Sequence, residues 1–243
     1  MKRFGRVGTA VAVAVMMVVA VGLMGCDGDN GTGGGNNTGG NSTNTNGNNT
    51  NGNNTTVSKP GSVLSGDTLT YAGQKYRTVV IDGKRWMAEN LNYQTDSSWC
   101  YENNTDNCAK YGRLYVWNAA MSACPNGWKL PSDEEWDDLA EAVGGRLVAG
   151  KLLKATSGWS VDDGTDEYGF SALPGGRRGK DGVFVSVGNY GSWWTSYEYD
   201  LDGSGWGAIK IGAYCHEMNA TSKIVSTWGY YKNVGRSVRC IKD

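Results

Sequence analysis

The distribution of apolar and polar residues divides the chain into three parts. Residues 7–23 are almost uniformly apolar, whereas residues 27–56 contain only Asp, Gly, Asn, Thr and Ser. Beyond them, short apolar runs alternate with polar and turn-forming residues, and all ten tryptophans and all thirteen tyrosines lie after residue 70. We therefore expect a leader over residues 1–25, a linker over residues 26–57 and one folded domain over residues 58–243.

Helical periodicity is clearest in two neighbouring segments. Residues 113–123 are predicted as a helix, because apolar side chains recur at helical spacing at Trp117, Ala120, Met121 and Cys124. The Pro-Asn-Gly of residues 125–127 is expected to stop it. A second helix is predicted to begin after Ser132, since Glu135 three positions later completes a capping box. Gly144-Gly145 ends this helix, and its apolar stripe is Trp136, Leu139, Ala140 and Val143.

The remaining apolar runs have the length and composition of strands. Residues 76–93 carry β-branched side chains on both sides of Asp82-Gly83, a dipeptide typical of a two-residue hairpin turn. Later β-rich runs predict strands over residues 169–176, 182–188, 192–199, 206–212, 223–231 and 236–242. Two helices early and many short strands later predict an α+β domain with antiparallel pairing.

The stretch SACPNGWKLPSDEEW, residues 122–136, is dense in side chains of the kind used in catalysis. Paired-carboxylate catalysis needs two carboxyl groups that face each other across a cleft. Asp133 and Glu134 instead fall in the exposed first turn of the predicted helix, where the helix dipole favours negative charge. Helix capping and core packing therefore account for this segment better than catalysis does.

The leader has the features of an export signal. Lys2, Arg3 and Arg6 precede the apolar run, which ends in Leu-Met-Gly-Cys. That ending resembles the lipobox of bacterial lipoproteins, in which the chain is cut before a cysteine that carries diacylglycerol. The resemblance implies lipidation of Cys26 and a membrane as partner, because two or three acyl chains anchor a protein stably. An uncleaved transmembrane anchor is the alternative.

Residues 27–56 of the linker contain no apolar residue, so we expect a flexible tether with a root-mean-square span of about 30 Å. The whole chain has a net charge of −1 and no basic stripe, so nucleic acid is not expected as a partner. These features predict a lipid-anchored, extracytoplasmic protein of the bacterial cell envelope, at the outer membrane or the cell surface.

The cysteines suggest disulfides more than catalysis. Cys100 and Cys108 close a small loop if they are oxidised, and two free thiols are the alternative. Cys215-His216 is the one place where Cys and His are neighbours in sequence. Adjacent residues of a strand point to opposite faces, so the two are not expected to act as nucleophile and base. A single His and the lack of a Cys-x-x-Cys motif also argue against zinc.

Several motifs occur in a characteristic order: CYENNTDNC, YGRLYVWNAAMSACPNGWKLPSDEEW, GFSALPGGRR, GSWWTS and GRSVRCIKD. Together they resemble the Fibrobacter succinogenes major paralogous domain, from about Val79 to Asp243. Members of that family are typically secreted or lipid-anchored bacterial proteins, and their biochemical activity is not established. The resemblance implies architecture and location rather than a mechanism.

Two segments also look like parts of C-type lectin-like domains. WNAAMSACPNGWKLPSDEEWDDL is similar to their first-helix region and VRCIKD to their last strand. GWKLPSDEEWDDLAEAVGG is similar to a segment of formylglycine-generating enzymes, which share that fold but need a pair of active cysteines. These likenesses imply a C-type lectin-like fold and a disulfide between Cys124 and Cys240. Cys215 is the rival partner for either cysteine.

One segment offers ligands for calcium. VDDGTDEYG, residues 161–169, supplies the hard oxygens of Asp162, Asp163, Asp166 and Glu167. The spacing differs from that of an EF-hand, and the Glu-Pro-Asn, Gln-Pro-Asp and Trp-Asn-Asp signatures of sugar-binding C-type lectins do not occur in the sequence. A solvated acidic loop is the alternative.

Location and aromatic content favour a tethered, non-catalytic module that binds carbohydrate or another surface polymer, because sugar rings stack on exposed aromatic faces. Most rings must build the core, since the chain has only three phenylalanines. The candidate contact residues come from late loops and strand ends: Tyr197, Tyr199, Trp206, Tyr230 and Tyr231. The competing interpretation is a structural or protein-interaction module of the cell envelope, with a surface protein as partner and no small ligand.

Overall fold

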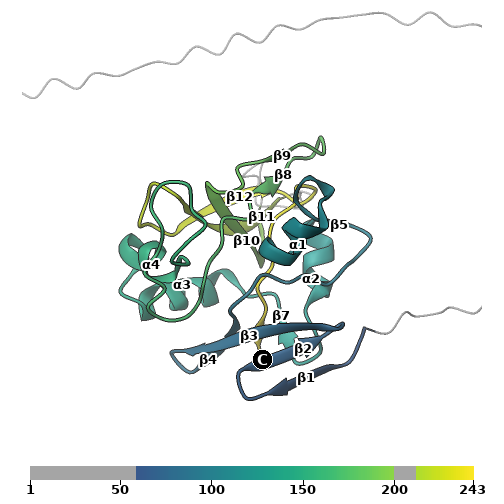
Figure 1. Cartoon of the computed structure of the whole chain (residues 1–243), viewed down its shortest axis with the longest axis horizontal. Coiled ribbons are helices and arrows are strands. Elements are labelled where there is room, and N and C mark those ends of the chain that lie inside the picture. Colours follow the sequence, from purple (N-terminus) through teal and green to yellow (C-terminus); the bar gives the residue numbers. More distant parts are fainter. Residues whose placement is uncertain (1–58, 200–211) are drawn as a thin grey trace, which may run out of the picture. The chain divides into compact units, whose positions relative to one another are not determined.

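The computed structural model describes residues 59–199 and 212–243, all within one compact unit (Figure 1). The larger of its two main sheets is antiparallel and has the strand order β1-β2-β3-β4-β13-β7. Its strands are β1 (Ser62–Ser65), β2 (Thr68–Tyr71), β3 (Gln74–Ile81), β4 (Lys84–Met87), β13 (Ile241–Lys242) and β7 (Trp128–Lys129). The C-terminal strand thus completes a sheet that begins with the first residues of the domain.

The second main sheet is also antiparallel and consists of β10 (Tyr190–Tyr199), β11 (Gly212–Asn219) and β12 (Ser226–Tyr231), in that order. Two short ribbons pair β5 (Ser98–Trp99) with β6 (Leu114–Tyr115) and β8 (Arg177–Arg178) with β9 (Phe184–Val185). The helices are η1 (Tyr101–Asn103), α1 (Thr105–Tyr111), α2 (Trp117–Ala123), α3 (Asp133–Ala142) and α4 (Arg146–Leu153). Helix α3 packs on β10 and β11, and α2 packs on β10 (Figure 1).

The predicted hairpin is confirmed. β3 and β4 pair with Ile81 opposite Lys84, so Asp82 and Gly83 form the two-residue turn. Their φ angles are 48° and 74°, as a type I′ turn requires. Local sequence is enough here because the turn's backbone twist matches that of the two strands.

Helix α3 also begins as predicted. The Glu135 backbone N–H donates to the Ser132 hydroxyl, and the Ser132 backbone N–H donates to the Glu135 carboxylate. Gly144 and Gly145 follow the helix with φ angles of 106° and 94°. The predicted stripe is buried and packs with Trp86, Phe170 and Trp193: it comprises Trp136, Leu139, Ala140 and Val143.

The other helices depart from the prediction. The helix expected over residues 113–123 begins only at Trp117, because Leu114–Tyr115 pairs with β5 as β6. Met121 is 44% exposed and does not belong to the buried stripe, and Cys124 is buried but extended, one residue beyond the helix. The described residues contain four α-helices, whereas the sequence predicted two. Helices α1 and α4 were not predicted, because they are too short to show a clear apolar period. None of the described helices is long and apolar enough to cross a membrane.

Several predicted strands are shorter or irregular. Residues 169–176 form no strand beyond a single bridge between Ala172 and Lys154, and the run at 182–188 contributes only β9. Residues 206–211 of another predicted strand lie outside the described residues, and β11 starts at Gly212. Of the predicted strand at 236–242, only β13 pairs with strands of the large sheet. The earlier residues form hydrogen bonds to elements of both main sheets and do not continue a regular strand.

Apolar side chains form two cores, one on each face of the three-stranded sheet. Trp194 and Cys215 are register partners and belong to the core with Trp117 and Cys240. Trp193 and Met218 point to the other face and belong to the core that α3 covers. Both faces of this sheet are therefore packed over part of their area.

Both expected disulfides are present. Cys100 bonds to Cys108, and Cys124 bonds to Cys240 with a Cα separation of 5.8 Å. Cys215 is the free cysteine of the described residues and is fully buried. The second bond ties the end of α2 to the last strand across a sequence separation of 116 residues.

Removal of the long-range disulfide should weaken the fold strongly. In the chain-entropy view, Cys124→Ser is expected to lower the free energy of unfolding by about 2–5 kcal/mol. Cys215→Ser removes no cross-link, so a much smaller loss is expected. Urea denaturation of both variants measures the difference, and non-reducing peptide mapping should return only the 100–108 and 124–240 pairs. A linkage from Cys215 to Cys240 would contradict the observed topology.

Candidate ligand-binding site

A pocket of about 320 Å³ lies on one face of the three-stranded sheet. The strand register explains its lining, because Tyr190 is opposite Asn219, and Glu217 is opposite Ser226. Alternate residues of β12 then continue the same face, and Arg177 reaches it from β8. The full lining is Arg177, Tyr190, Glu217, Asn219, Ser226, Trp228 and Tyr230. We name this cavity the Trp228 pocket.

Trp228 is the most exposed large ring of the pocket. Its residue is 56% exposed, although its register partner Cys215 is completely buried. The difference arises because β12 is the edge strand of its sheet, with no further strand beside it in the described structure. An exposed indole on a regular strand offers a flat, rigid apolar surface to a ligand.

A buried ion pair forms the floor of the pocket. Glu217 is 5% exposed and its Oε1 accepts hydrogen bonds from Arg236, at 2.8 Å, and from the Ser192 hydroxyl, at 3.0 Å. The guanidinium of Arg236 also lies 3.7 Å from the ring centroid of Tyr230. Burial, and then the charge of Glu217, raises the pKa of Tyr230. Oε2 of Glu217 accepts no hydrogen bond from any described residue, so it remains able to accept one from a ligand.

Cys215 lies behind this floor and has no catalytic geometry. Its Sγ is 3.5 Å from the Ser192 hydroxyl, and burial raises the pKa of its thiol to about 11. A thiol with that pKa is protonated at neutral pH and is a poor nucleophile. His216 points to the opposite face of β11, where its Nε2 lies 2.7 Å from Asp133.

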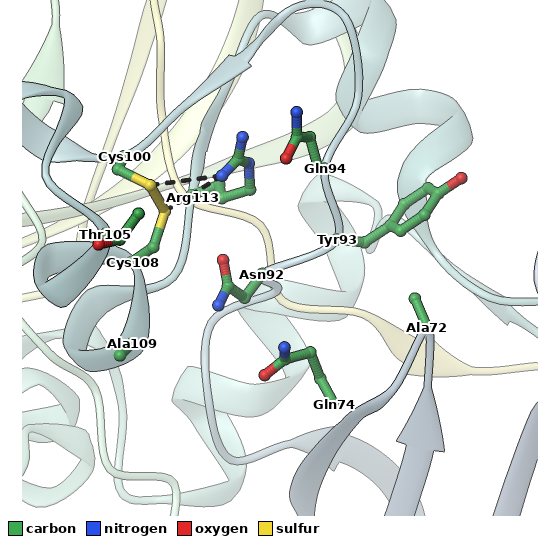
Figure 2. A pocket seen from close by; sticks show the side chains of 10 residues that line it. All are labelled: Ala72, Gln74, Asn92, Tyr93, Gln94, Cys100, Thr105, Cys108, Ala109 and Arg113. Carbon is green, nitrogen blue, oxygen red and sulfur yellow. Dashed lines mark hydrogen bonds between the residues drawn. A yellow bond between two sulfur atoms is a disulfide. The ribbon is translucent and has the colours of Figure 1, made fainter.

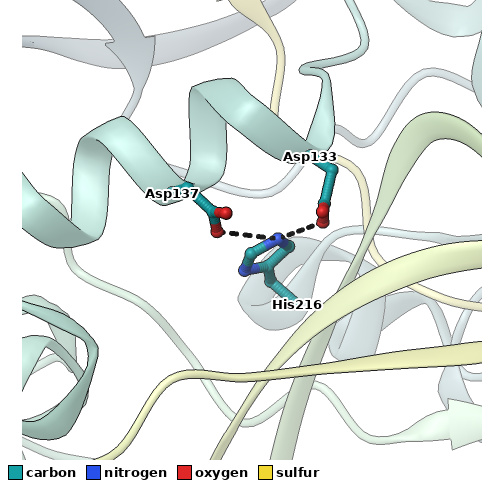
Figure 3. Close-up of side chains that lie close together, drawn as sticks. All are labelled: Asp133, Asp137 and His216. Carbon is teal, nitrogen blue, oxygen red and sulfur yellow. Dashed lines mark hydrogen bonds and ion pairs between the residues drawn. The ribbon is translucent and has the colours of Figure 1, made fainter.

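The opposite face carries a charged cluster (Figure 3). The Nε2 of His216 contacts Asp133 at 2.7 Å and lies 3.9 Å from Asp137, and the imidazole stacks on Trp136 with centroids 5.4 Å apart. One ligand atom from each of Asp133, Asp137 and His216 lies within 4.8 Å of the others, which resembles a metal site. Arg146, however, forms an ion pair with Asp137. The Asp137 carboxylate is therefore already paired with a cation, and the cluster anchors α3 and α4 to the sheet.

The predicted ligand-binding residues are divided between the two faces. Tyr197 lines a separate cavity of about 420 Å³ beside the charged cluster, together with Tyr214. Tyr199 packs on Tyr214, with centroids 4.8 Å apart, whereas Tyr230 belongs to the Trp228 pocket. Tyr231 is exposed and follows Tyr230 on the other face. Trp206 and the lipidation candidate Cys26 lie outside the described residues.

A further cavity, of about 610 Å³, lies beside the Cys100–Cys108 disulfide (Figure 2). Its polar lining includes the amides of Gln74, Asn92 and Gln94, and Arg113 lies 3.3 Å from both sulfur atoms. Its single aromatic residue, Tyr93, is engaged with Tyr71 at 4.9 Å between centroids. The cavity thus lacks a free ring for stacking, and the Trp228 pocket is the stronger candidate.

The acidic segment at 161–169 does not gather its carboxylates. Asp162 pairs with Lys151 at 2.7 Å, and Asp163 accepts from the Trp159 backbone N–H at 2.8 Å. Asp166 accepts from the backbone and hydroxyl of Ser171, while Glu167 contacts the Thr165 hydroxyl. Among the described residues, three potential ligand atoms converge at Asp133, Asp137 and His216 but not in this segment. Each acid has a separate local partner, which is the geometry of a structured loop.

The fold defines an α+β domain with two main antiparallel sheets, and the three-stranded sheet carries an aromatic-lined pocket. The sequence profile of the Fibrobacter succinogenes major domain matches residues 79–242, and the chain belongs to that family. Strands β1 and β2 precede the matched residues and extend the same sheet. No curated protein matches the chain. No solved structure matches it either.

Sequence reasoning missed most of the Trp228 pocket. Trp228 stands in a run of aromatic residues, STWGYY, whose alternation predicts two faces but not which face is open. Arg177 and Glu217 are 40 positions apart and carry no shared motif. The one local signal is the alternation of polar Glu217 and Asn219 about Met218 in β11.

The contact between Asp133 and His216 should make stability depend on acid pH. The hydrogen bond from His216 lowers the pKa of Asp133 in the folded chain. A depressed carboxyl pKa stabilises the fold above the unfolded value of about 3.9, and this contribution is lost as pH falls through the folded pKa. The gap in unfolding free energy between wild type and Asp133→Asn should therefore shrink below about pH 4 in urea titrations.

A second variant separates this contact from the charge at the start of the helix. Glu134→Gln removes a neighbouring charge from the same turn without touching the Asp133–His216 hydrogen bond. If Glu134→Gln reproduces the full effect of Asp133→Asn, the helix dipole rather than His216 is responsible.

Proposed function

We propose that the protein is a non-catalytic module that binds carbohydrate through the Trp228 pocket. The observation that carries the proposal is an exposed indole on a rigid strand directly beside convergent polar groups. Sugars present an apolar ring face and a rim of hydroxyl groups, so they match an aromatic wall with hydrogen-bonding groups at its edge. The pocket volume of about 320 Å³ is at the small end of ligand sites, as expected for a shallow saccharide subsite.

The polar rim supplies both donors and acceptors. Asn219 offers its amide NH₂, while its amide oxygen already accepts from the backbone and hydroxyl of Thr221, and Ser226 offers a hydroxyl. The free Oε2 of Glu217 accepts hydrogen bonds only, and its orientation is fixed by Arg236 and Ser192. A preorganised rim limits the side-chain entropy lost on binding. The raised pKa of the Cys215 thiol and its separation from His216 support a binding role over a catalytic one.

The remainder of the chain supports a tethered location. We propose that the chain is exported, that Cys26 becomes its lipidated N-terminus, and that residues 27–56 hold the domain away from the bilayer at the cell surface. We further propose that the domain is a divergent C-type lectin-like fold. The disulfide between the end of α2 and the last strand, and the order of helices before the three-stranded sheet, support that assignment.

Truncation of the indole tests the binding site. Trp228→Ala should reduce binding to immobilised polysaccharides about thirtyfold, the effect of losing a hot-spot aromatic worth about 2 kcal/mol. Because Trp228 is exposed, the substitution should change the free energy of unfolding of the protein by less than about 1 kcal/mol. Retention of the detergent-solubilised full chain on beads of cellulose, xylan, pectin and peptidoglycan provides the measurement.

A matched aromatic on the opposite face provides the control. Tyr197 is 53% exposed and lines the other cavity, so Tyr197→Ala should leave retention unchanged. Loss of binding in Tyr197→Ala but not in Trp228→Ala would move the site to the opposite face. Absence of retention on every polymer would favour the protein-interaction alternative.

Mass spectrometry of the purified full-length product tests the anchor. Wild type should begin at Cys26 and carry the added mass of acyl chains. Cys26→Ser should carry no acyl mass and should retain residues 1–25, because the cleavage requires the cysteine. A wild-type product that keeps its leader would instead indicate a transmembrane anchor.

A further inference from the structure

The charges around the Trp228 pocket do not cancel. The carboxylate of Glu217 is paired at 2.8 Å with Arg236, and both side chains are buried. Arg177 lines the same pocket, yet no described residue forms an ion pair or a side-chain hydrogen bond with it. Its guanidinium lies 5.6 Å from the ring centroid of Tyr190, a cation–π distance. Among the described residues, the pocket therefore retains one positive charge without a paired carboxylate.

Arg177 is held in a way that suits an incoming anion. The short pairing of β8 with β9 fixes its backbone, with Arg177 opposite Val185. The neighbouring Arg178 turns to other aromatic rings, 4.0 Å from the centroid of Trp99, and does not line the pocket. A guanidinium is weakly hydrated and presents a planar fork of N–H donors that matches a carboxylate in two parallel hydrogen bonds.

We propose that the Trp228 pocket binds an acidic glycan, in which a uronic acid ring stacks on Trp228 and its carboxylate pairs with Arg177. The inference rests on the carbohydrate-binding function proposed above and names the class of sugar. The charge balance supports it, since a neutral sugar leaves Arg177 unpaired within the complex, whereas a carboxylate neutralises it. Asn219, Ser226 and the free oxygen of Glu217 then face the ring hydroxyls.

A matched pair of polymers tests the carboxylate directly. Polygalacturonate and the same polymer after chemical reduction of its carboxyl groups to primary alcohols share ring size and linkage but differ in charge. The detergent-solubilised full chain should bind polygalacturonate at least about tenfold more tightly than the reduced polymer. Dextran sulfate provides a charged polymer without carboxylates and should bind more weakly than polygalacturonate.

Three variants test whether the preference for polygalacturonate depends on Arg177. Arg177→Gln should weaken polygalacturonate binding by about tenfold or more and should remove most of the preference for polygalacturonate over the reduced polymer. Arg177→Lys keeps the charge without the planar fork and should give an intermediate loss. Lys75→Gln removes one positive charge from an exposed site on β3, in the other sheet, and should have no effect.

The outcomes separate this inference from the function on which it rests. Equal binding of the two galacturonan polymers, still lost in Trp228→Ala, would overturn the acidic-glycan assignment and keep the carbohydrate site. Equal binding of dextran sulfate, with Arg177→Lys as effective as wild type, would show charge attraction alone and would also overturn it. If the wild-type chain binds none of the polymers, the proposed function itself is overturned.

Discussion

Backbone hydrogen bonds of residues 235–241 hold the two main sheets together, and the other elements are placed relative to this segment. All seven residues are buried. The Ser237 N–H donates to Ser192 in β10, whereas Val238 and Cys240 accept from Leu91 and Met87 beside the large sheet. Since these backbone groups are removed from water, each requires a partner, and the two sheets and the short ribbons β5–β6 and β8–β9 supply them.

Two buried arginines in this segment obtain their partners differently. Arg239 contacts no carboxylate at ion-pair distance in the described structure; its partners are the carbonyls of Met87, Phe170 and Ser171 and the side-chain oxygen of Asn90. Burial lowers the pKa of Arg239 to about 9, so it stays protonated at neutral pH. Arg236 instead neutralises Glu217. One arginine thus organises irregular loops through neutral acceptors, and the other determines the charge of the pocket floor.

The two faces of the three-stranded sheet consequently have different roles. On one face, α3 covers Trp193 and the hydrogen bond between His216 and Asp133 fixes the helix in place. On the other face, the edge position of β12 leaves Trp228 exposed, while the guanidinium of Arg236 packs against the ring of Tyr230. Because Arg236 of the last segment already pairs with Glu217, Arg177 lines the pocket without a carboxylate partner among the described residues. The proposed preference for an acidic sugar therefore follows from which buried charges are already paired within the protein.

Short-range physical chemistry made part of this structure predictable from sequence. The Asp82-Gly83 turn and the Ser132–Glu135 capping box depend on residues at most three positions apart, and both are present as predicted. The α+β class and the disulfides also follow from local patterns and family resemblance. The Trp228 pocket required the tertiary structure, since its residues come from β8, β10, β11 and β12. Alternation along a strand assigns side chains to two faces, but only the packing of neighbouring elements decides which face is covered and which charges are already paired.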